Sequence, residues 1–383
     1  MSDRKKLLGA PRRVVVKIGT NALSSPDGAG LDPGRIDLLA EDVVAVSEGG
    51  ERGVEVVLVS SGAVGAGIAE LGLSGRPGVL RIEQACAAVG QCRLMEHYMR
   101  AFGARGRKVG QILLTQGDLR DRRRYLNFSN TVSALLEMGV VPIINENDTV
   151  AVDELHYGVR FGDNDELSAQ VAIAVDADLL VILTDTDGLY TADPKQDPQA
   201  RLIGVASASE VDSLACAGGA GSRLGKGGMA SKVHAAKEVS ESGRLAVIAG
   251  AGERVLRRVL SGEEVGTLLI PSGRRLRKRK HWIRHTLHPR GTLVVDEGAA
   301  RAVLERGKSL LPSGVKRVDG QFSPGDAVKI VAEDGRELAR GLVNYSSEEI
   351  DAIKGLQSAE IERVLGCCTH EEVVHRDNLC TTE

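Results

Sequence analysis

Residues 54–67 read VEVVLVSSGAVGAG, an apolar run that changes into two serines and three spaced glycines. A short apolar run bounded by turn residues is typical of a strand buried on both faces of a parallel sheet. The same pattern occurs at residues 12–20, RRVVVKIGT, where the run ends in Gly-Thr. The two stretches predict neighbouring buried strands that each end in a glycine-rich turn.

Strands and helices alternate over the first 270 residues. Further strands are predicted at 109–115, 140–148, 178–188, 244–250 and 266–271. Apolar residues at helical spacing predict helices at 32–50, 80–102, 127–139, 165–177, 229–243 and 253–262. This alternation is typical of an α/β protein, and it predicts a three-layer α/β/α fold with a mainly parallel sheet.

The composition changes after residue 270. Residues 271–290 hold eight Lys or Arg and no acidic residue, so we interpret 271–289 as a basic linker between domains. Residues 291–350 contain short strand patterns, Gly and Pro turns and one helix, which predict a small β-rich domain; we place this domain at 290–368. Residues 1–270 would then form the first domain, and 369–383 a tail that we expect to be poorly packed.

The bulk composition excludes several classes of protein. With 383 residues, a net charge of -3 and 42% hydrophobic residues, the chain shows no overall signal for nucleic-acid or membrane binding. No apolar run approaches the ~20 residues of a membrane span, and no signal peptide is recognisable. The six cysteines include no C-x-x-C pair, and GCCTH near the C-terminus lacks zinc-site spacing, so we predict no metal site and a cytoplasmic location.

Polar residues follow almost every predicted strand. They are Lys17, Gly19, Ser61, the NEND stretch 145–148, the GDNDE stretch 162–166, Thr184 and Asp185. Ligands of open parallel sheets bind beyond the carboxyl ends of the strands, so these residues predict a single site. Glycine turns and helix N-termini in the same place favour a phosphate ligand.

The stretch GKGGMASK at 225–232 is a candidate phosphate loop. It does not fit the Walker pattern G-x-x-x-x-G-K-[ST], because Ala220 stands at the first glycine position and Gly227 follows Lys226. Lys17 and Lys232 could neutralise a transferring phosphoryl group, and Asp165 could orient both lysines. Each motif alone has a structural explanation; their occurrence together at strand ends predicts phosphoryl transfer.

Nine stretches resemble the amino-acid kinase family, and among its members those that phosphorylate glutamate and carry a C-terminal PUA domain. They are VVVKIGTNAL (14–23), VLVSSGAVGAG (57–67), AAVGQCRLM (87–95), GQILLT (110–115), VPIINENDTV (141–150), FGDNDELSA (161–169), LLVILTDTDGLYTADP (179–194), GKGGMASK (225–232) and VDEGAARAVLERGKSLLPSGV (295–315). They span nearly the whole chain in colinear order.

The resemblance implies ATP-dependent phosphorylation of the side-chain carboxylate of L-glutamate to L-glutamyl 5-phosphate, the first step of proline biosynthesis. Lys17, Lys232 and Asp165 would be catalytic. Ser61, Asp148 and Asn164 would bind glutamate, with Asp148 suited to its ammonium group and Ser61 to a carboxylate. The implied ATP-binding residues are Lys17, Gly19, Thr184, Asp185, Lys226, Gly227, Gly228, Met229, Ala230, Ser231 and Lys232.

The resemblance also implies partners. Mg²⁺ would accompany ATP, proline would act as a feedback inhibitor, and the chain would form a homo-oligomer, a dimer or tetramer. A glutamyl-phosphate reductase is the expected downstream partner, because an acyl phosphate is unstable. The chain departs from the family pattern at Lys226, where a small hydroxyl residue is usual, and at Arg223, where glycine is common.

Two alternatives remain open at this point. The chain could be a sister kinase that acts on N-acetylglutamate, aspartate, carbamate or a nucleoside monophosphate. It could instead be an RNA-binding protein with a kinase-like scaffold, since PUA domains are best known from RNA-modifying proteins. The second alternative predicts damage to the phosphate-contacting set, yet Lys17, Asp165 and Lys232 are all present. Few aromatic residues are available to stack on bases, so we expect no nucleic-acid partner.

Overall fold

The computed structural model describes residues 3–25, 30–49, 53–151, 164–194, 196–210, 228–271, 287, 289–366 and 370–382. The chain divides into two compact units, residues 1–275 and 276–383. Apart from 271, 287 and 289, the predicted linker 271–289 lies outside the described residues. None of the helices in these ranges is long and apolar enough to cross a membrane.

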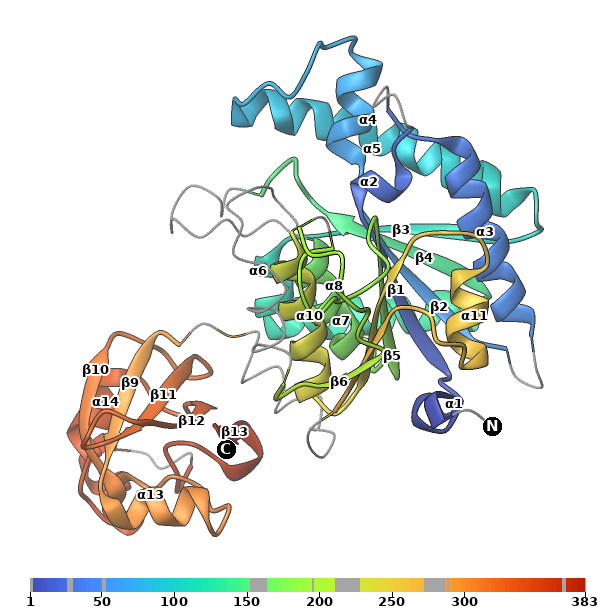
Figure 1. Ribbon diagram of the computed structural model, residues 1–383. Helices are drawn as coiled ribbons and strands as arrows, with labels where there is room; N and C mark the ends of the chain where they lie inside the picture. Colours follow the sequence, from blue (N-terminus) through green and yellow to red (C-terminus); the bar gives the residue numbers. More distant parts are fainter. Residues whose placement is uncertain are drawn as a thin grey trace. The chain divides into compact units, whose positions relative to one another are not determined.

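An eight-stranded sheet forms the centre of the first unit (Figure 1). Its strands are β1 (Arg13–Ile18), β2 (Glu55–Ser60), β3 (Lys108–Leu114), β4 (Val140–Glu146), β5 (Leu179–Thr184), β6 (Val205–Ser207), β7 (Leu245–Gly250) and β8 (Thr267–Ile270). Their order is β3-β4-β2-β1-β5-β7-β8-β6, and only the β7–β8 pair among these strands is antiparallel. The expected mainly parallel sheet is confirmed.

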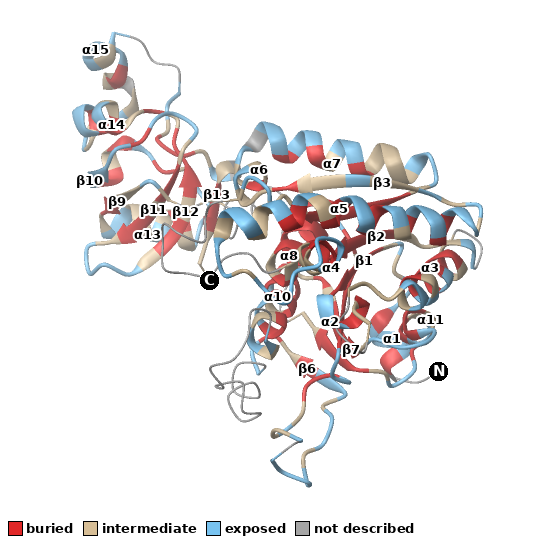
Figure 2. Ribbon diagram, turned by 90° about the horizontal axis from the view of Figure 1, so that it is seen from above, coloured by how far each residue is buried: buried red, intermediate tan, exposed pale blue. Residues whose placement is uncertain are grey.

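Helices cover both faces of this sheet. They are α1 (Asp3–Leu8), α2 (Thr20–Leu23), α3 (Pro33–Glu48), α4 (Ala63–Glu70), α5 (Leu80–Gly103), α6 (Gln116–Arg120), α7 (Arg122–Glu137), α8 (Asn164–Ala174), α10 (Met229–Glu241) and α11 (Val255–Ser261). Helices α3, α5 and α11 pack together, whereas α7, α8 and α10 cover the other face of the sheet (Figure 1). Between these layers β1 and β2 are buried along almost their whole length (Figure 2), which explains their uninterrupted apolar runs.

The glycine-rich stretch after β2 was predicted to be a turn, but it forms helix α4. Its glycines serve close packing against α5 instead. A Cβ atom at Gly67 would lie 1.8 Å from the carbonyl oxygen of Cys86, and one at Gly90 would lie 1.8 Å from that of Ala63. Only glycine permits two helix backbones to approach this closely.

The second unit is a five-stranded sheet with small helices. It contains β9 (Gly291–Val295), α13 (Glu297–Leu304), β10 (Val315–Gly320), β11 (Ala327–Ala332), β12 (Glu337–Leu342), α14 (Ser347–Ile353), α15 (Ile361–Leu365) and β13 (Leu379–Thr381). The strand order is β10-β9-β11-β12-β13, and the unit has a hydrophobic core of its own. The small C-terminal β-rich domain that the sequence predicts is therefore present.

The prediction of a poorly packed tail after residue 369 was wrong. Val373 and Val374 are fully buried, and Leu379 is 4% exposed. Strand β13 pairs antiparallel with β12, in a register that places Cys380 opposite Arg340. The segment is ordered because it pairs with an edge strand. A strand of three residues is too short to show a hydrophobic pattern from which this pairing could be predicted.

Helix α10 carries a buried acid, Glu238, that must take up a proton for the chain to fold at neutral pH, and this lowers stability. Glu238 is 8% exposed, and burial together with the negative charges of Glu166 and Glu241 raises the pKa of Glu238 to about 8. The folded chain keeps this proton up to pH ~8, whereas the unfolded chain releases it near pH ~4. Stability therefore falls as the pH rises through this window.

We expect Glu238→Gln to stabilise the protein by about 2 kcal/mol at pH 8, because the substitution removes this penalty. The gain should shrink as the pH falls toward 4. Thermal unfolding between pH 5 and 8 measures both effects. Glu241→Gln is a graded comparison: Glu241 is exposed and raises the pKa of Glu238 only through its charge, so its removal should stabilise the protein less. A melting temperature for the Glu238 variant at or below that of the wild type at pH 8 would contradict the prediction.

Candidate active site

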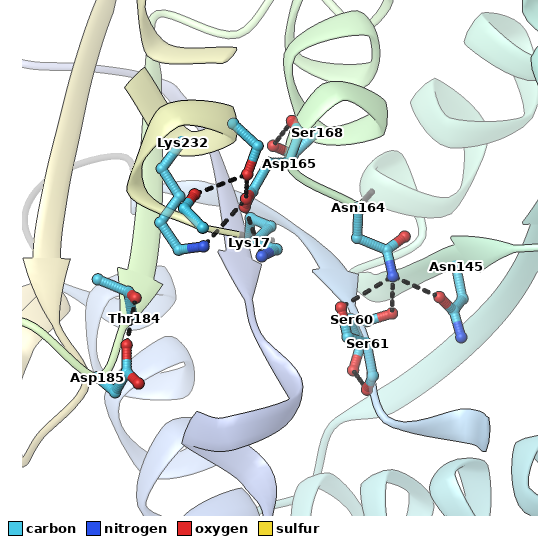
Figure 3. A network of polar contacts seen from close by, with 12 residues as sticks. Lys17, Ser60, Ser61, Asn145, Asn164, Asp165, Ser168, Thr184, Asp185 and Lys232 are labelled. Carbon is cyan, nitrogen blue, oxygen red and sulfur yellow. Dashed lines mark hydrogen bonds and ion pairs between the residues drawn. The ribbon is translucent and has the colours of Figure 1, made fainter. Parts of the chain in front are cut away.

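The residues predicted to carry chemistry meet at the carboxyl edge of the parallel strands. Lys17 is the next-to-last residue of β1, and Ser61 and Asp185 directly follow β2 and β5. Helices α8 and α10 begin at the same edge and bring Asp165 and Lys232 to it (Figure 3). Both helices point their N-termini at this edge, and partial positive charge there favours an anionic ligand.

Two lysines share one carboxylate. Lys17 Nζ lies 2.5 Å from Oδ1 of Asp165, and Lys232 Nζ lies 3.1 Å from Oδ2. The three side chains come from β1, α10 and α8, and their residues are only 3%, 6% and 0% exposed. Two positive charges and one negative charge leave the cluster with a net charge of +1, which suits a phosphoryl group.

Hydrogen bonds hold Asp165 in place. Ser231 Oγ donates to its Oδ2 at 2.8 Å, and Ser168 Oγ donates to its backbone carbonyl at 2.6 Å. Burial opposes ionisation of Asp165, but the charges of Lys17 and Lys232 outweigh it and lower the pKa of Asp165. The carboxylate thus stays ionised at neutral pH and keeps both ammonium groups fixed at the strand edge.

A cluster of uncharged polar groups adjoins the lysine pair. Asn164 precedes Asp165 in the chain, and its Nδ2 donates to Ser61 Oγ at 2.9 Å and to Asn145 Oδ1 at 3.1 Å. The carbonyl of Ser60 lies 3.4 Å from the same nitrogen. The carboxyl ends of β2 and β4 and the start of α8 therefore converge on one amide (Figure 3).

A third group lies at the end of β5. Thr184 Oγ1 donates to Asp185 Oδ1 at 3.0 Å, and Asn21 Nδ2 donates to Asp185 Oδ2 at 3.3 Å. Burial opposes ionisation of Asp185, but these hydrogen bonds outweigh it and lower the pKa of Asp185. The backbone N–H of Ala251 donates to the Thr184 carbonyl at 2.6 Å, so the ends of β5 and β7 are tied together.

The remaining predicted residues fall in three places. Gly19 caps α2 beside Lys17, where an added Cβ would lie 3.5 Å from the lysine Nζ. Asp148 is half-buried in the turn two residues beyond the end of β4. Gly228 is the N-cap of α10, and Met229, Ala230 and Ser231 form its first turn. Lys226, Gly227 and the unusual Arg223 lie outside the described residues.

The structure adds residues that the sequence prediction missed. Asn145 Nδ2 donates to Oε1 of Gln91 at 2.9 Å, and Tyr98 OH is 2.8 Å from Ser60 Oγ. Gln91 and Tyr98 lie on α5, and both are buried. The sequence of α5 has the pattern of an ordinary amphipathic helix. The one signal that could have pointed to these residues is a glutamine at a position of the apolar face.

Comparison with known proteins identifies the class. The amino acid kinase family model matches residues 12–250, and the PUA domain model matches residues 291–365. Carbamate kinase from Giardia lamblia bound to AMP-PNP aligns over 69% of this chain and 99% of its own, with a TM-score of 0.51 and 20% identity. That likeness concerns the fold. The chain belongs to the amino acid kinase family, and it is a phosphotransferase.

Curated relatives narrow the assignment within this family. Glutamate 5-kinase from Geobacter sp. (strain M21) is 52% identical, and that from Pseudomonas entomophila (strain L48) is 51% identical. Each alignment covers 98% of this chain and 99% of the relative. The chain belongs to the glutamate 5-kinase branch, as its sequence motifs and domain order predicted.

Proposed function

We propose that the chain transfers the γ-phosphoryl group of ATP to the side-chain carboxylate of L-glutamate and forms L-glutamyl 5-phosphate. The supporting observation is the pair Asn164–Asp165 at the start of α8. Asp165 holds two lysines that suit phosphate, and the adjacent Asn164 is bonded to a polar cluster that suits an amino acid. The two half-sites are thereby fixed next to each other, as in-line transfer requires.

In this proposal the glutamate carboxylate oxygen attacks the γ-phosphorus, and the bond from phosphorus to the bridging oxygen of ADP breaks. The attacking group is already ionised at neutral pH, so no general base is needed. Lys17 and Lys232 stabilise the charge on the transferring group, and Asp165 positions both ammonium groups. Catalysis then consists of positioning and electrostatic stabilisation.

The nucleotide would bind on the β5 side of the lysines. Thr184 and Asp185 stand at that strand end, and Gly228 through Lys232 open helix α10 toward the phosphates. Gly19 leaves space beside Lys17, and Lys226 and Gly227 complete the proposed loop. Mg²⁺ would neutralise charge on the phosphates. The described residues contain no cluster of metal-binding side chains, and Mg²⁺ commonly binds through substrate phosphates, so we propose that ATP brings it.

Glutamate would bind at the other half-site. Ser61 can donate its hydroxyl hydrogen to a carboxylate, since its oxygen already accepts from Asn164. Asp148 would take the ammonium group, because a carboxylate is its natural partner. Asn164 would contribute its amide oxygen Oδ1, which can accept a hydrogen bond from the substrate.

The wider role belongs to the same proposal. Glutamyl 5-phosphate would be the first intermediate of proline biosynthesis in the cytoplasm, with proline as feedback inhibitor. An acyl phosphate hydrolyses readily in water, which favours prompt use by a glutamyl-phosphate reductase. We further propose a homo-oligomer, a dimer or tetramer.

ADP release with Mg-ATP and a set of acceptors tests the substrate. We expect turnover with L-glutamate and no more than background with N-acetylglutamate, aspartate, carbamate or UMP. The glutamate half-site would bind a free ammonium group, which N-acetylglutamate, carbamate and UMP lack. The side chain of aspartate is one methylene shorter, so its carboxylate would not reach the γ-phosphoryl group. Preference for another acceptor would leave the kinase class intact and refute the substrate. Absence of turnover with all of them would refute the proposed function, and binding of tRNA would then be measured.

A further inference from the structure

A chain of side-chain amides runs from helix α5 into the half-site proposed for glutamate. Gln91 Oε1 accepts from Asn145 Nδ2 at 2.9 Å. Asn145 Oδ1 accepts from the backbone N–H of Glu146 at 2.9 Å and from Asn164 Nδ2 at 3.1 Å. Asn164 in turn donates to Ser61 Oγ at 2.9 Å. The groups come from α5, β4, the start of α8 and the residue that follows β2, so the chain links four separate parts of the fold.

One backbone group fixes the direction of every bond in this chain. The N–H of Glu146 can only donate, so the oxygen of the Asn145 amide must face it and the nitrogen must face Gln91. Gln91 must then present its oxygen. Asn164 must present its nitrogen to Asn145 Oδ1, which agrees with its contact to the Ser60 carbonyl, another obligatory acceptor.

This direction decides what the half-site offers a ligand. Ser61 Oγ receives a hydrogen bond from Asn164, so its own hydrogen is left to be donated to a carboxylate. Asn164 Oδ1 is buried without a hydrogen-bond partner among the described residues, and it can accept from an N–H group. If the Asn164 amide were rotated so that its oxygen and nitrogen exchanged places, Ser61 would have to donate its hydrogen to Asn164. The amide would then offer the ligand N–H groups in place of an oxygen.

Gln91 occupies a position where packing alone would favour an apolar side chain. It is 8% exposed, and its inward neighbours on α5, Ala87, Leu94 and Met95, are apolar. Its Nε2 has no hydrogen-bond partner in the part of the chain that the structure describes. A buried amide group that is only half satisfied lowers stability, so the bond to Asn145 must serve another purpose.

We propose that Gln91 is a positioning residue for the amino-acid acceptor. By holding the Asn145 amide it keeps Asn164 and Ser61 in the orientation that binds glutamate. Gln91 acts through Asn145, and it does not act on the lysine pair. This inference rests on the proposed function, because it assigns Gln91 to the glutamate half-site of that reaction.

The test compares Gln91→Met with the wild type in ADP release. Methionine is of similar size but has no amide oxygen, so Asn145 Nδ2 loses its buried acceptor and the chain is no longer held. We expect the KM for L-glutamate to rise about tenfold, as for a lost buried hydrogen bond, with the KM for ATP unchanged. Gln91→Glu keeps an acceptor oxygen and should hold the KM for glutamate within about threefold of wild type.

Two further variants separate positioning from packing. Met95→Ala removes an equally buried side chain one turn along α5, and it should lower the melting temperature without a selective change in the KM for glutamate. In an Asn145→Ala background, Gln91→Met should add no further rise in this KM, because the partner through which it acts is gone.

The outcomes distinguish the inference from the proposed function. Equal changes in both KM values, additive effects of the two substitutions, or an unchanged KM in Gln91→Met would overturn the role of Gln91 while the wild type still phosphorylates glutamate. A wild type that does not turn over glutamate would overturn the proposed function itself, and the inference with it.

Discussion

Asp165→Asn should lower kcat by roughly a hundredfold to a thousandfold, comparable to the removal of a preorganised electrostatic group in other enzymes. The substitution preserves size but removes the single negative charge between two buried ammonium groups. Lys17 and Lys232 would then repel each other at the strand edge, and each would move toward solvent or lose its proton. Neither change leaves two fixed positive charges for the phosphoryl group.

The same substitution should also reduce stability, by about 3 kcal/mol at pH 7, since breaking a buried ion pair leaves uncompensated charge. The pKa of Asp165 is lowered in the folded chain, so its ionised form stabilises the protein above pH ~4. That contribution is lost as the pH falls through the folded pKa, and the difference between variant and wild type should narrow in acid.

Asp42→Asn is a suitable control for this prediction. Asp42 is 4% exposed, is paired with Arg257, and accepts the backbone N–H of Leu256 at the start of α11. It should cost stability with little loss of kcat. Steady-state kinetics and urea unfolding of both variants give the comparison. Equal kcat in Asp165→Asn and the wild type would show that the two lysines do not depend on this carboxylate.

Gly90→Ala should be strongly destabilising, although it adds only one methyl group. The added Cβ would lie 1.8 Å from the carbonyl oxygen of Ala63 and 2.3 Å from the backbone nitrogen of Gly67, so α4 and α5 must separate. We expect a loss of about 3 kcal/mol or more, at the upper end of overpacking effects. The adjacent Gln91 would move with the helix, so the KM for glutamate should rise as well.

Gly103→Ala provides the matched control. Gly103 ends the same helix, and an added Cβ there meets nothing within 4 Å. Alanine should be neutral or stabilise by about 0.5 kcal/mol through its better helix propensity. Urea unfolding and glutamate titration of the two variants measure the difference. Similar stabilities for both would mean that the helix pair adapts to a Cβ at Gly90.

The sequence predicts well which candidate residues lie together where each of them stands at the end of a buried strand. Lys17, Ser61 and Thr184 follow apolar runs, and parallel strands bring such positions to one edge. Asp165 and Lys232 open helices at the same edge. Their contact could be expected from charge alone, but the shared carboxylate and its hydrogen bond from Ser231 depend on how α8 and α10 pack.

Features that depend on distant packing could not be predicted in this way. The glycines of α4 resemble turn residues locally, and only the approach of α5 explains Gly67. Gln91 lies in a 24-residue helix with several other polar residues, so its sequence position does not single it out. It is distinguished by its hydrogen bond to Asn145, which is 54 positions away in the chain. Strand β13 forms through antiparallel pairing with β12, which would otherwise be an edge strand of the sheet. Lys226 and Gly227 stay predictions.

Transfer of oxygen from glutamate to phosphate tests the proposed reaction most directly. L-Glutamate labelled with ¹⁸O in its side-chain carboxylate is incubated with Mg-ATP, the enzyme and hydroxylamine, and the products are examined by mass spectrometry. Attack of that carboxylate on the γ-phosphorus, followed by attack of hydroxylamine on the acyl carbon, predicts glutamyl hydroxamate and inorganic phosphate with one ¹⁸O atom. Unlabelled phosphate without hydroxamate would show that water accepts the phosphoryl group, and it would contradict a site built to phosphorylate glutamate.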